Sequence, residues 1–234
     1  MQIVYNIEEL LEFNRDFPRD LVVLREKTAP SSEQLRGYAL RIGGIVEAHG
    51  FGEIRSIRYD PRVTNSTALS LGPLPFHTDG SFLQHPPRRF MLSCISDDGG
   101  GGGSNIFYPL DELLTILPQW AEESFRTADF LFPQTYDGDL AISWIGPILS
   151  TGVDGCSRIR WRSDHLFRPA VVNACGTRAA EAVTWLHEHL LTAQPITYLS
   201  HPGDTILVPN ESILHGRTAL TAQSQRLVLR VWVG

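Results

Sequence analysis

The sequence predicts a mainly β protein, a barrel or sandwich with helices packed against it. After residue 50, short runs rich in β-branched and aromatic residues are separated by Gly, Pro and Asn, and few helical patterns interrupt them. These β-type runs are EIRSIRYD (53–60), RRFMLSCIS (88–96), CSRIRWRS (156–163), PITYLS (195–200), DTILVP (204–209) and RLVLRVWV (226–233).

The first 50 residues have a different pattern, which predicts helices. NIEELLEFN (6–14) begins with a possible cap, Asn6, and early carboxylates, and its apolar residues share one helical face. LVVLR (21–25) is a short apolar run typical of a strand. SSEQLRGYALRIGGIVEAHG (31–50) opens with a Ser cap and has apolar residues at helical spacing. We therefore expect residues 1–50 to be a helical part that packs on a β core.

Within residues 51–234 the sequence predicts one inserted helix, TRAAEAVTWLHEHLL (177–191), and a shorter one over 110–117 before Pro118. The aromatic-rich segment 130–144 is a candidate lid. The glycine run DDGGGGGSN (97–105) is no phosphate loop, because no Gly-Lys-Ser/Thr follows it. A chain of 234 residues is expected to form a single domain, 1–234.

Composition excludes several classes of partner. A net charge of −6 argues against nucleic acid or an anionic membrane, which both need basic surface. No apolar stretch approaches the ~18 residues of a membrane helix, and the N-terminus does not read as a secretory signal. Three cysteines without a CxxC pair predict free thiols in a reducing compartment. We expect a cytoplasmic protein with a small-molecule partner, and the oligomeric state stays open.

The segment LPFHTDGSF (74–82) holds a candidate metal site. If it is extended, His77 and Asp79 project from the same face, because side chains alternate along a strand. His215, after the strand-like DTILVP, is the candidate third ligand. Two His and one carboxylate form a triad that holds Fe(II) with three positions open, but zinc accepts the same set.

Two arginines of the last apolar run, Arg226 and Arg230, lie four residues apart and so share a face of a strand. One interpretation is a solvent-exposed edge. The other is capture of a carboxylate near the metal, because inward guanidinium groups are unfavourable unless each meets an anion.

Taken together, these motifs resemble the taurine dioxygenase/clavaminate synthase-like (TauD/TfdA) family of Fe(II)- and 2-oxoglutarate-dependent oxygenases. The specific part is their order and spacing, in which Arg226 follows His215 by eleven residues (226 − 215 = 11). The matching segments are FHTDGSF (76–82), HPPRRFMLSCI (85–95), GGGGGSNIFYPLDELL (99–114), HGRTAL (215–220) and RLVLRVW (226–232).

The resemblance implies a double-stranded β-helix (jelly-roll, cupin-like) core and a set of site residues. His77, Asp79 and His215 match the iron ligands, and Arg226 matches the partner of the far carboxylate of 2-oxoglutarate. The family usually has Gly-Gly-Asp-Thr where this chain has GGSN, so that Ser104 and Asn105 stand at the Asp and Thr positions. Either side chain is a candidate contact to the cosubstrate.

The resemblance also implies the reaction. Fe(II), O2 and 2-oxoglutarate would oxidise an unactivated C–H, with release of succinate and CO2. Because Asp79 supplies the carboxylate, hydroxylation, desaturation or cyclisation is expected in place of halogenation. The expected substrate is a small polar metabolite, such as an amino acid or a natural-product intermediate, with Arg230, Asp164 and His165 as candidate contacts. A metal-containing β-barrel binding protein without redox chemistry and a zinc hydrolase remain alternatives.

Overall fold

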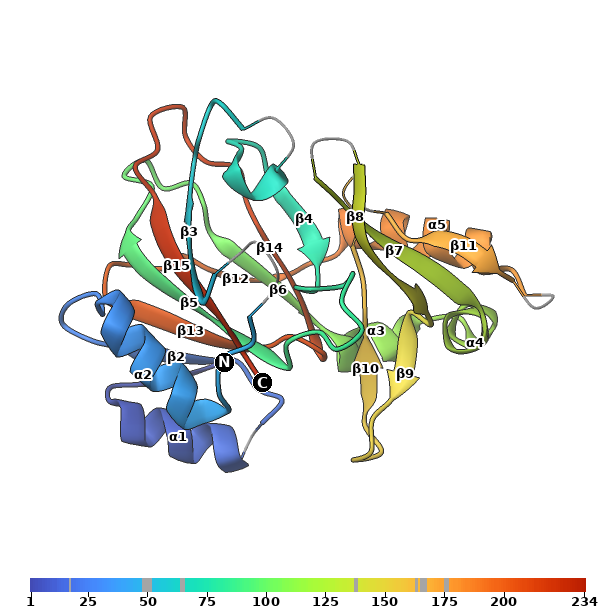
Figure 1. Ribbon diagram of the computed structural model, residues 1–234, viewed down its shortest axis with the longest axis horizontal. Helices are drawn as coiled ribbons and strands as arrows, with labels where there is room; N and C mark the ends of the chain where they lie inside the picture. The colour runs from blue at the N-terminus through green and yellow to red at the C-terminus, as the bar shows by residue number, and fades with distance from the viewer. Residues whose placement is uncertain are drawn as a thin grey trace.

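The computed structural model describes residues 1–16, 18–47, 52–63, 66–136, 139–162, 164, 168–174 and 177–234 of the chain, with the backbone alone over 134–142. Its centre is a pair of facing β-sheets (Figure 1). The larger sheet has the strand order β1-β2-β13-β5-β15-β3, and the smaller one β12-β6-β14-β4. Neighbouring strands are antiparallel, except that β1 and β2 are parallel. The predicted mainly β, jelly-roll fold is confirmed.

The bounds of these strands are β1 (Gln2–Val4), β2 (Val22–Arg25), β3 (Ile54–Arg58), β4 (Leu74–His77), β5 (Arg89–Ser96), β6 (Asn105–Pro109), β12 (Ile196–Tyr198), β13 (Asp204–Pro209), β14 (Ile213–Arg217) and β15 (Leu227–Val233). A short 3₁₀ helix, η1 (Thr67–Leu69), precedes β4. The core between the sheets contains buried residues from both, among them Phe90 and Ile206 of the larger sheet and Phe107 and Ile213 of the smaller one. Apolar side chains at alternate positions of each strand therefore close the sandwich.

Helices α1 (Ile7–Asp16) and α2 (Ser32–Ile42) cover the outer face of the larger sheet (Figure 1). Ser31 caps α2 in a reciprocal arrangement with Gln34, as the sequence predicts. The helix ends at residue 42, well before the predicted end at 50. Gly44 explains this early end, because its φ of 87° lies in the left-handed region that helices do not continue through.

Residues 1–50 also contain two strands. The predicted strand over 21–25 corresponds to β2, and β1, which was not predicted, pairs with it in parallel; together they extend the larger sheet beyond β13. Val22, Val23 and Leu24 are almost completely buried, because α1 and α2 cover one face of β2 and the second sheet faces the other. The N-terminal part therefore completes the β core, as well as packing on it.

A second group of elements lies beside the smaller sheet (Figure 1). It contains α3 (Leu110–Ile116), α4 (Gln119–Thr127), β7 (Asp129–Tyr136), β8 (Asp139–Gly146), β9 (Leu149–Thr151), β10 (Ser157–Ile159), β11 (Ala170–Asn173) and α5 (Ala179–Thr192). The predicted helices over 177–191 and 110–117 correspond to α5 and α3, whereas α4 was not predicted. Pro118 stands directly before the first turn of α4, where its missing N–H leaves no hydrogen bond unmade. Pro118 therefore follows the end of α3 and precedes the start of α4.

The candidate lid, 130–144, forms most of the β7–β8 hairpin. Phe130 and Phe132 of β7 are completely buried in the apolar cluster between α4, α5 and the smaller sheet. In the described part of the chain, no helix has both the length and the apolarity needed to cross a membrane.

Candidate active site

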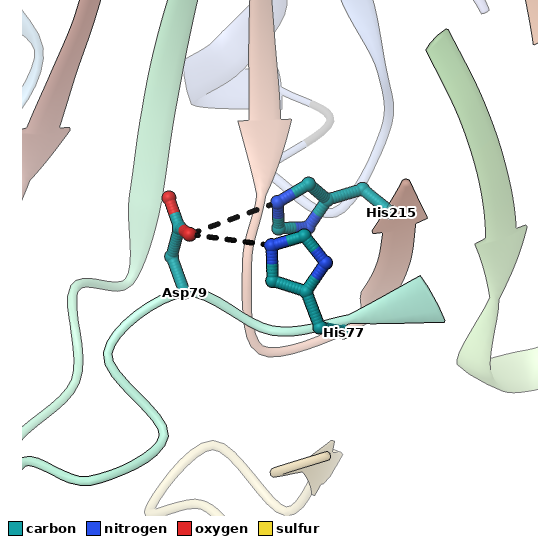
Figure 2. A group of neighbouring side chains, drawn as sticks. All are labelled: His77, Asp79 and His215. Carbon is teal, nitrogen blue, oxygen red and sulfur yellow. Dashed lines mark ion pairs between the residues drawn. The ribbon is translucent and has the colours of Figure 1, made fainter. Parts of the chain in front are cut away.

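Strand pairing brings the three predicted metal ligands together. β14 runs antiparallel to β4 with His215 directly opposite His77, and their ring centroids lie 4.1 Å apart. Asp79 lies in the turn that follows β4. The carboxylate oxygen Oδ1 of Asp79 is 3.6 Å from Nε2 of His77 and 3.8 Å from Nε2 of His215 (Figure 2). One ligand atom from each residue lies within 4.8 Å of the others, and all three residues are buried.

The backbone around Asp79 is fixed by a residue that sequence reasoning missed. The amide of Asp79 donates to Oδ1 of Asn210 at 2.7 Å, and Nδ2 of Asn210 donates to the carbonyls of Asp79 at 2.9 Å and Pro87 at 2.8 Å. Gly80 follows with a φ of 66°, a conformation that favours glycine. Asn210 is completely surrounded by protein, and no signal in its immediate sequence marks it as a partner of the HTD segment.

The imidazole rings are suited to bind a cation. Nδ1 of His77 lies 2.9 Å from the carbonyl oxygen of Pro75, and because a carbonyl only accepts, this nitrogen carries the proton. The other ring nitrogen of His77, Nε2, faces Asp79 and His215 (Figure 2). Burial, together with the neighbouring His77, holds the pKa of His215 well below its usual range, so the ring of His215 is neutral.

The carboxylate of Asp79 is ionised. Burial opposes its ionisation, but the charge of Arg230, which donates to Oδ1, outweighs burial and holds the pKa of Asp79 well below its usual range. Two imidazoles and one carboxylate, converging from a rigid β scaffold, fit the ligand set of a non-heme Fe(II) centre. Nδ1 of His215, by contrast, is buried without a hydrogen-bond partner among the described residues.

Two residues of β15 hold the carboxylate oxygens of Asp79. Nη1 of Arg230 donates to Oδ1 at 2.9 Å, and the indole Nε1 of Trp232 donates to Oδ2 at 2.7 Å. Arg230, a predicted substrate contact, donates to Asp79, a predicted metal ligand, and also lines the adjacent cavity. Sequence reasoning missed Trp232, although it follows Arg230 by two residues and so shares its face of the strand.

A cavity of about 220 Å³ opens beside the three ligands. Alternate residues of the last strand line it, and several arginines surround it. The arginines are Arg55, Arg162, Arg217, Arg226 and Arg230, and the apolar part of the lining includes Ile57, Leu69, Leu74, Phe82, Leu92 and Val228. The inward orientation of Arg226 and Arg230 excludes the solvent-exposed-edge interpretation.

Arg226 and Asn105 meet at the wall of this cavity. The guanidinium of Arg226 is largely buried and donates to Oδ1 of Asn105 at 3.1 Å, while Nδ2 of Asn105 donates to the hydroxyl of Ser200 at 2.9 Å. Burial lowers the pKa of Arg226, which still leaves it a cation near neutral pH. Among the described residues, the cavity lining includes Asn105 but not Ser104, whose backbone pairs with Thr218.

The two remaining predicted substrate contacts are Asp164 and His165. Asp164 is buried, and its Oδ2 accepts from Nε of Arg162 at 2.7 Å. Arg162 lines the cavity and forms a β-bridge with His77. Asp164 therefore holds the side chain of a residue that lines the cavity. His165 lies outside the described residues.

Arg217 is also buried, and its guanidinium donates to the carbonyls of Thr218, Ser70 and Gly72. A buried arginine with several backbone acceptors has a structural role.

Comparison with known proteins agrees with the fold and identifies the family. Residues 12–232 match the family model described as "Taurine catabolism dioxygenase TauD, TfdA family". The chain is 26% identical over 246 aligned positions to 3-((Z)-2-isocyanoethenyl)-1H-indole synthase of Fischerella ambigua (strain UTEX 1903), covering 97% of this chain and 86% of that protein.

Solved structures with the same fold include two oxygenases. An asparagine oxygenase, in complex with Fe(II), 3-hydroxyasparagine and succinate, superposes with a TM-score of 0.75 at 20% identity, covering 97% of this chain and 78% of that one. PvcB from Pseudomonas aeruginosa superposes with a TM-score of 0.72 at 18% identity, covering 97% and 80%. A second structure of PvcB describes it as an Fe, α-ketoglutarate dependent oxygenase from an isonitrile synthetic pathway.

Proposed function

Because the chain belongs to the taurine catabolism dioxygenase TauD, TfdA family and is a 2-oxoglutarate-dependent, non-heme iron dioxygenase, we propose that His77, Asp79 and His215 hold its Fe(II). The observation that carries this proposal is the approach of one ligand atom from each residue to within 4.8 Å of the others. Family membership decides against the two alternatives, a binding protein without redox chemistry and a zinc hydrolase.

The bound metal supplies the redox chemistry, in which O2 and 2-oxoglutarate are consumed, succinate and CO2 are released and a substrate C–H is oxidised. The protein's own residues bind and orient the reactants. Arg226 is proposed to hold the far carboxylate of 2-oxoglutarate, with Asn105 supporting the guanidinium through its Oδ1. Ser104 stays a weaker candidate because it lies outside the cavity lining.

The proposed substrate is a small polar metabolite, an amino acid or a compound derived from one. Two of the similar proteins support this class, since one is an asparagine oxygenase and another belongs to an isonitrile synthetic pathway. The cavity supports a substrate with an acidic group, because five arginines line it and Asp79 is the one acidic residue among its described lining residues. Arg162, oriented by Asp164, is placed to contact such a group.

We also propose that residues 1–234 act as a single domain in the cytoplasm. The shared core supports one domain, because β1 and β2 belong to the same sheet as β13, β5 and β15. The thiols of Cys94 and Cys156 are unpaired, which supports a reducing compartment, and Cys175 lies outside the described residues.

An anaerobic titration tests the iron site. Fe(II) followed by 2-oxoglutarate should give the metal-free protein the weak visible charge-transfer band of the chelate, and His215→Ala should abolish it. His85→Ala is the matched control, because His85 is exposed and is not among the residues that line the cavity. A band of equal intensity in His215→Ala would contradict the assignment, as would tight metal binding by the unaltered protein without any band.

A further inference from the structure

The carboxylate of Asp79 has two oxygens in different surroundings. Oδ1 faces the two imidazoles, at 3.6 Å from Nε2 of His77 and 3.8 Å from Nε2 of His215. Oδ2 accepts from the indole Nε1 of Trp232 at 2.7 Å, a short hydrogen bond between two buried groups. Both oxygens therefore accept from protein donors, Oδ1 from Arg230 and Oδ2 from Trp232, but only Oδ1 is also turned toward the two imidazoles.

We propose that Trp232 is a positioning residue for the iron ligand Asp79, and that its indole N–H restricts this carboxylate to binding through Oδ1 alone. A carboxylate with both oxygens free can bind a cation through one oxygen or both. Binding through both would occupy a position that the 2-oxo acid or O2 needs. This inference rests on the proposed function, because it concerns the ion that His77, Asp79 and His215 are proposed to hold.

The chemistry of the indole suits this role. Its N–H is a donor only, with no lone pair to bind a metal and no charge. It therefore holds an oxygen beside a divalent cation without repelling the cation. Arg230 differs, because its guanidinium carries a positive charge and donates to Oδ1, the oxygen that faces the imidazoles. Arg230 neutralises the buried carboxylate, whereas Trp232 fixes which of its oxygens is available.

The indole is itself held firmly in place. Trp232 lies opposite Phe90 in the β15–β5 register and packs in the apolar cluster between the sheets. The guanidinium carbon of Arg230 lies 4.9 Å from the centroid of its ring. On the backbone side, the amide of Asp79 is bound by Asn210. The carboxylate is thus fixed both at its own backbone and at Oδ2, which restricts its rotation.

The test compares Trp232→Phe with the unaltered protein in anaerobic titrations with Co(II), whose visible spectrum responds to coordination number. The phenyl ring keeps most of the apolar volume and removes the N–H. Loss of a hydrogen bond to a metal ligand commonly weakens metal binding by about 10–100-fold, and we expect an increase of this size in Kd. The visible bands of the saturated variant should weaken, as expected when the carboxylate binds through both oxygens.

Trp185→Phe is the matched control. Trp185 lies on α5, stacked on His189, and is not in the cavity lining. Its Kd should stay within about twofold of that of the unaltered protein, the precision that such a comparison needs. An unchanged Kd or an unchanged saturated spectrum in Trp232→Phe would overturn the inference, and so would an equal loss in Trp185→Phe. If the unaltered protein itself bound no Co(II), the proposed iron site would fail together with the inference.

A measurement on the unaltered protein covers the case in which Trp232→Phe does not fold. The chain contains five tryptophans, each with one indole N–H signal in a ¹⁵N NMR spectrum. We expect the indole signal of Trp232 to be protected from hydrogen exchange and shifted strongly by Co(II). Trp161→Phe identifies the signal of Trp161, so that the two tryptophans are not confused. If no protected indole signal responds to Co(II), the inference is wrong.

Discussion

Replacing Arg226 by Met should remove most of the affinity for 2-oxoglutarate without disturbing the metal ligands. Arg226 is only 8% exposed, and its guanidinium donates to the neutral Oδ1 of Asn105 in the cavity wall, at 3.1 Å. A buried cation of this kind is suited to a carboxylate that arrives with a ligand. Methionine keeps a similar length and apolar volume but supplies no donor.

The size of the effect follows from the hydrogen bonds lost. Two bonds from a guanidinium to a carboxylate, at about 1.5 kcal/mol each, contribute roughly 3 kcal/mol, or about 160-fold in Kd. At a 2-oxoglutarate concentration of 100 times the Kd of the unaltered protein, binding stabilises the fold by about 2.7 kcal/mol. For a chain of this size that corresponds to a rise in Tm of about 5–10 °C. At the same concentration Arg226→Met should gain only ~0.3 kcal/mol, a rise of about 1 °C or less.

Anaerobic thermal unfolding with Mn(II) in place of iron measures the rise in Tm of the unaltered protein and of Arg226→Met. Each rise is the difference between the Tm with and without 2-oxoglutarate. Arg58→Met is the matched control, because Arg58 is an exposed arginine of the neighbouring strand β3. It should retain the full rise in Tm. An equal rise in Arg226→Met and the unaltered protein would refute the assignment of Arg226 as the carboxylate partner.

Two further predictions concern the glycine-rich turn before β6. Gly103 has a φ of 74°, and a Cβ there would lie 2.9 Å from Cδ of Arg226, so Gly103→Ala should destabilise the fold by about 1–2 kcal/mol and weaken 2-oxoglutarate binding. Gly99→Ala, at a φ of 71° with open space around it, should lower stability without weakening 2-oxoglutarate binding. Urea unfolding measures the loss of stability, and the rise in Tm with 2-oxoglutarate measures the loss of binding. Equal ligand affinity in both variants would contradict this reasoning. Asp98 accepts from the amide of Thr221 at 3.1 Å, and although burial opposes its ionisation, its hydrogen bonds lower its pKa to about 2. Because the folded pKa lies below the unfolded one, this stabilisation is present above about pH 4 and is lost as the pH falls toward 2. Asp98→Ala should therefore lower the free energy of unfolding, measured with urea at pH 7, by about 1–3 kcal/mol. The difference between the variant and the unaltered protein should shrink at pH 3. A difference that is the same at both pH values would show that the charge does not contribute.

Side-chain direction along a single strand is a local property, and the sequence alone determined it correctly. Alternation placed Arg226 and Arg230 on one face of the last strand, and both line the cavity. Local capping chemistry likewise predicted the start of α2 at Ser31. The choice of His77, Asp79 and His215 depended on residue types known to bind metals, together with the resemblance to a family.

Distances between segments far apart in the chain were decided only by the tertiary structure. The β14–β4 register sets His215 opposite His77, although 138 positions separate them (215 − 77 = 138). The partners of Asp79 are of the same kind: Asn210 and Trp232 reach it across strands, and no local spacing connects them to the HTD segment. Local sequence fixes which way a side chain points, but pairing between strands fixes what it meets.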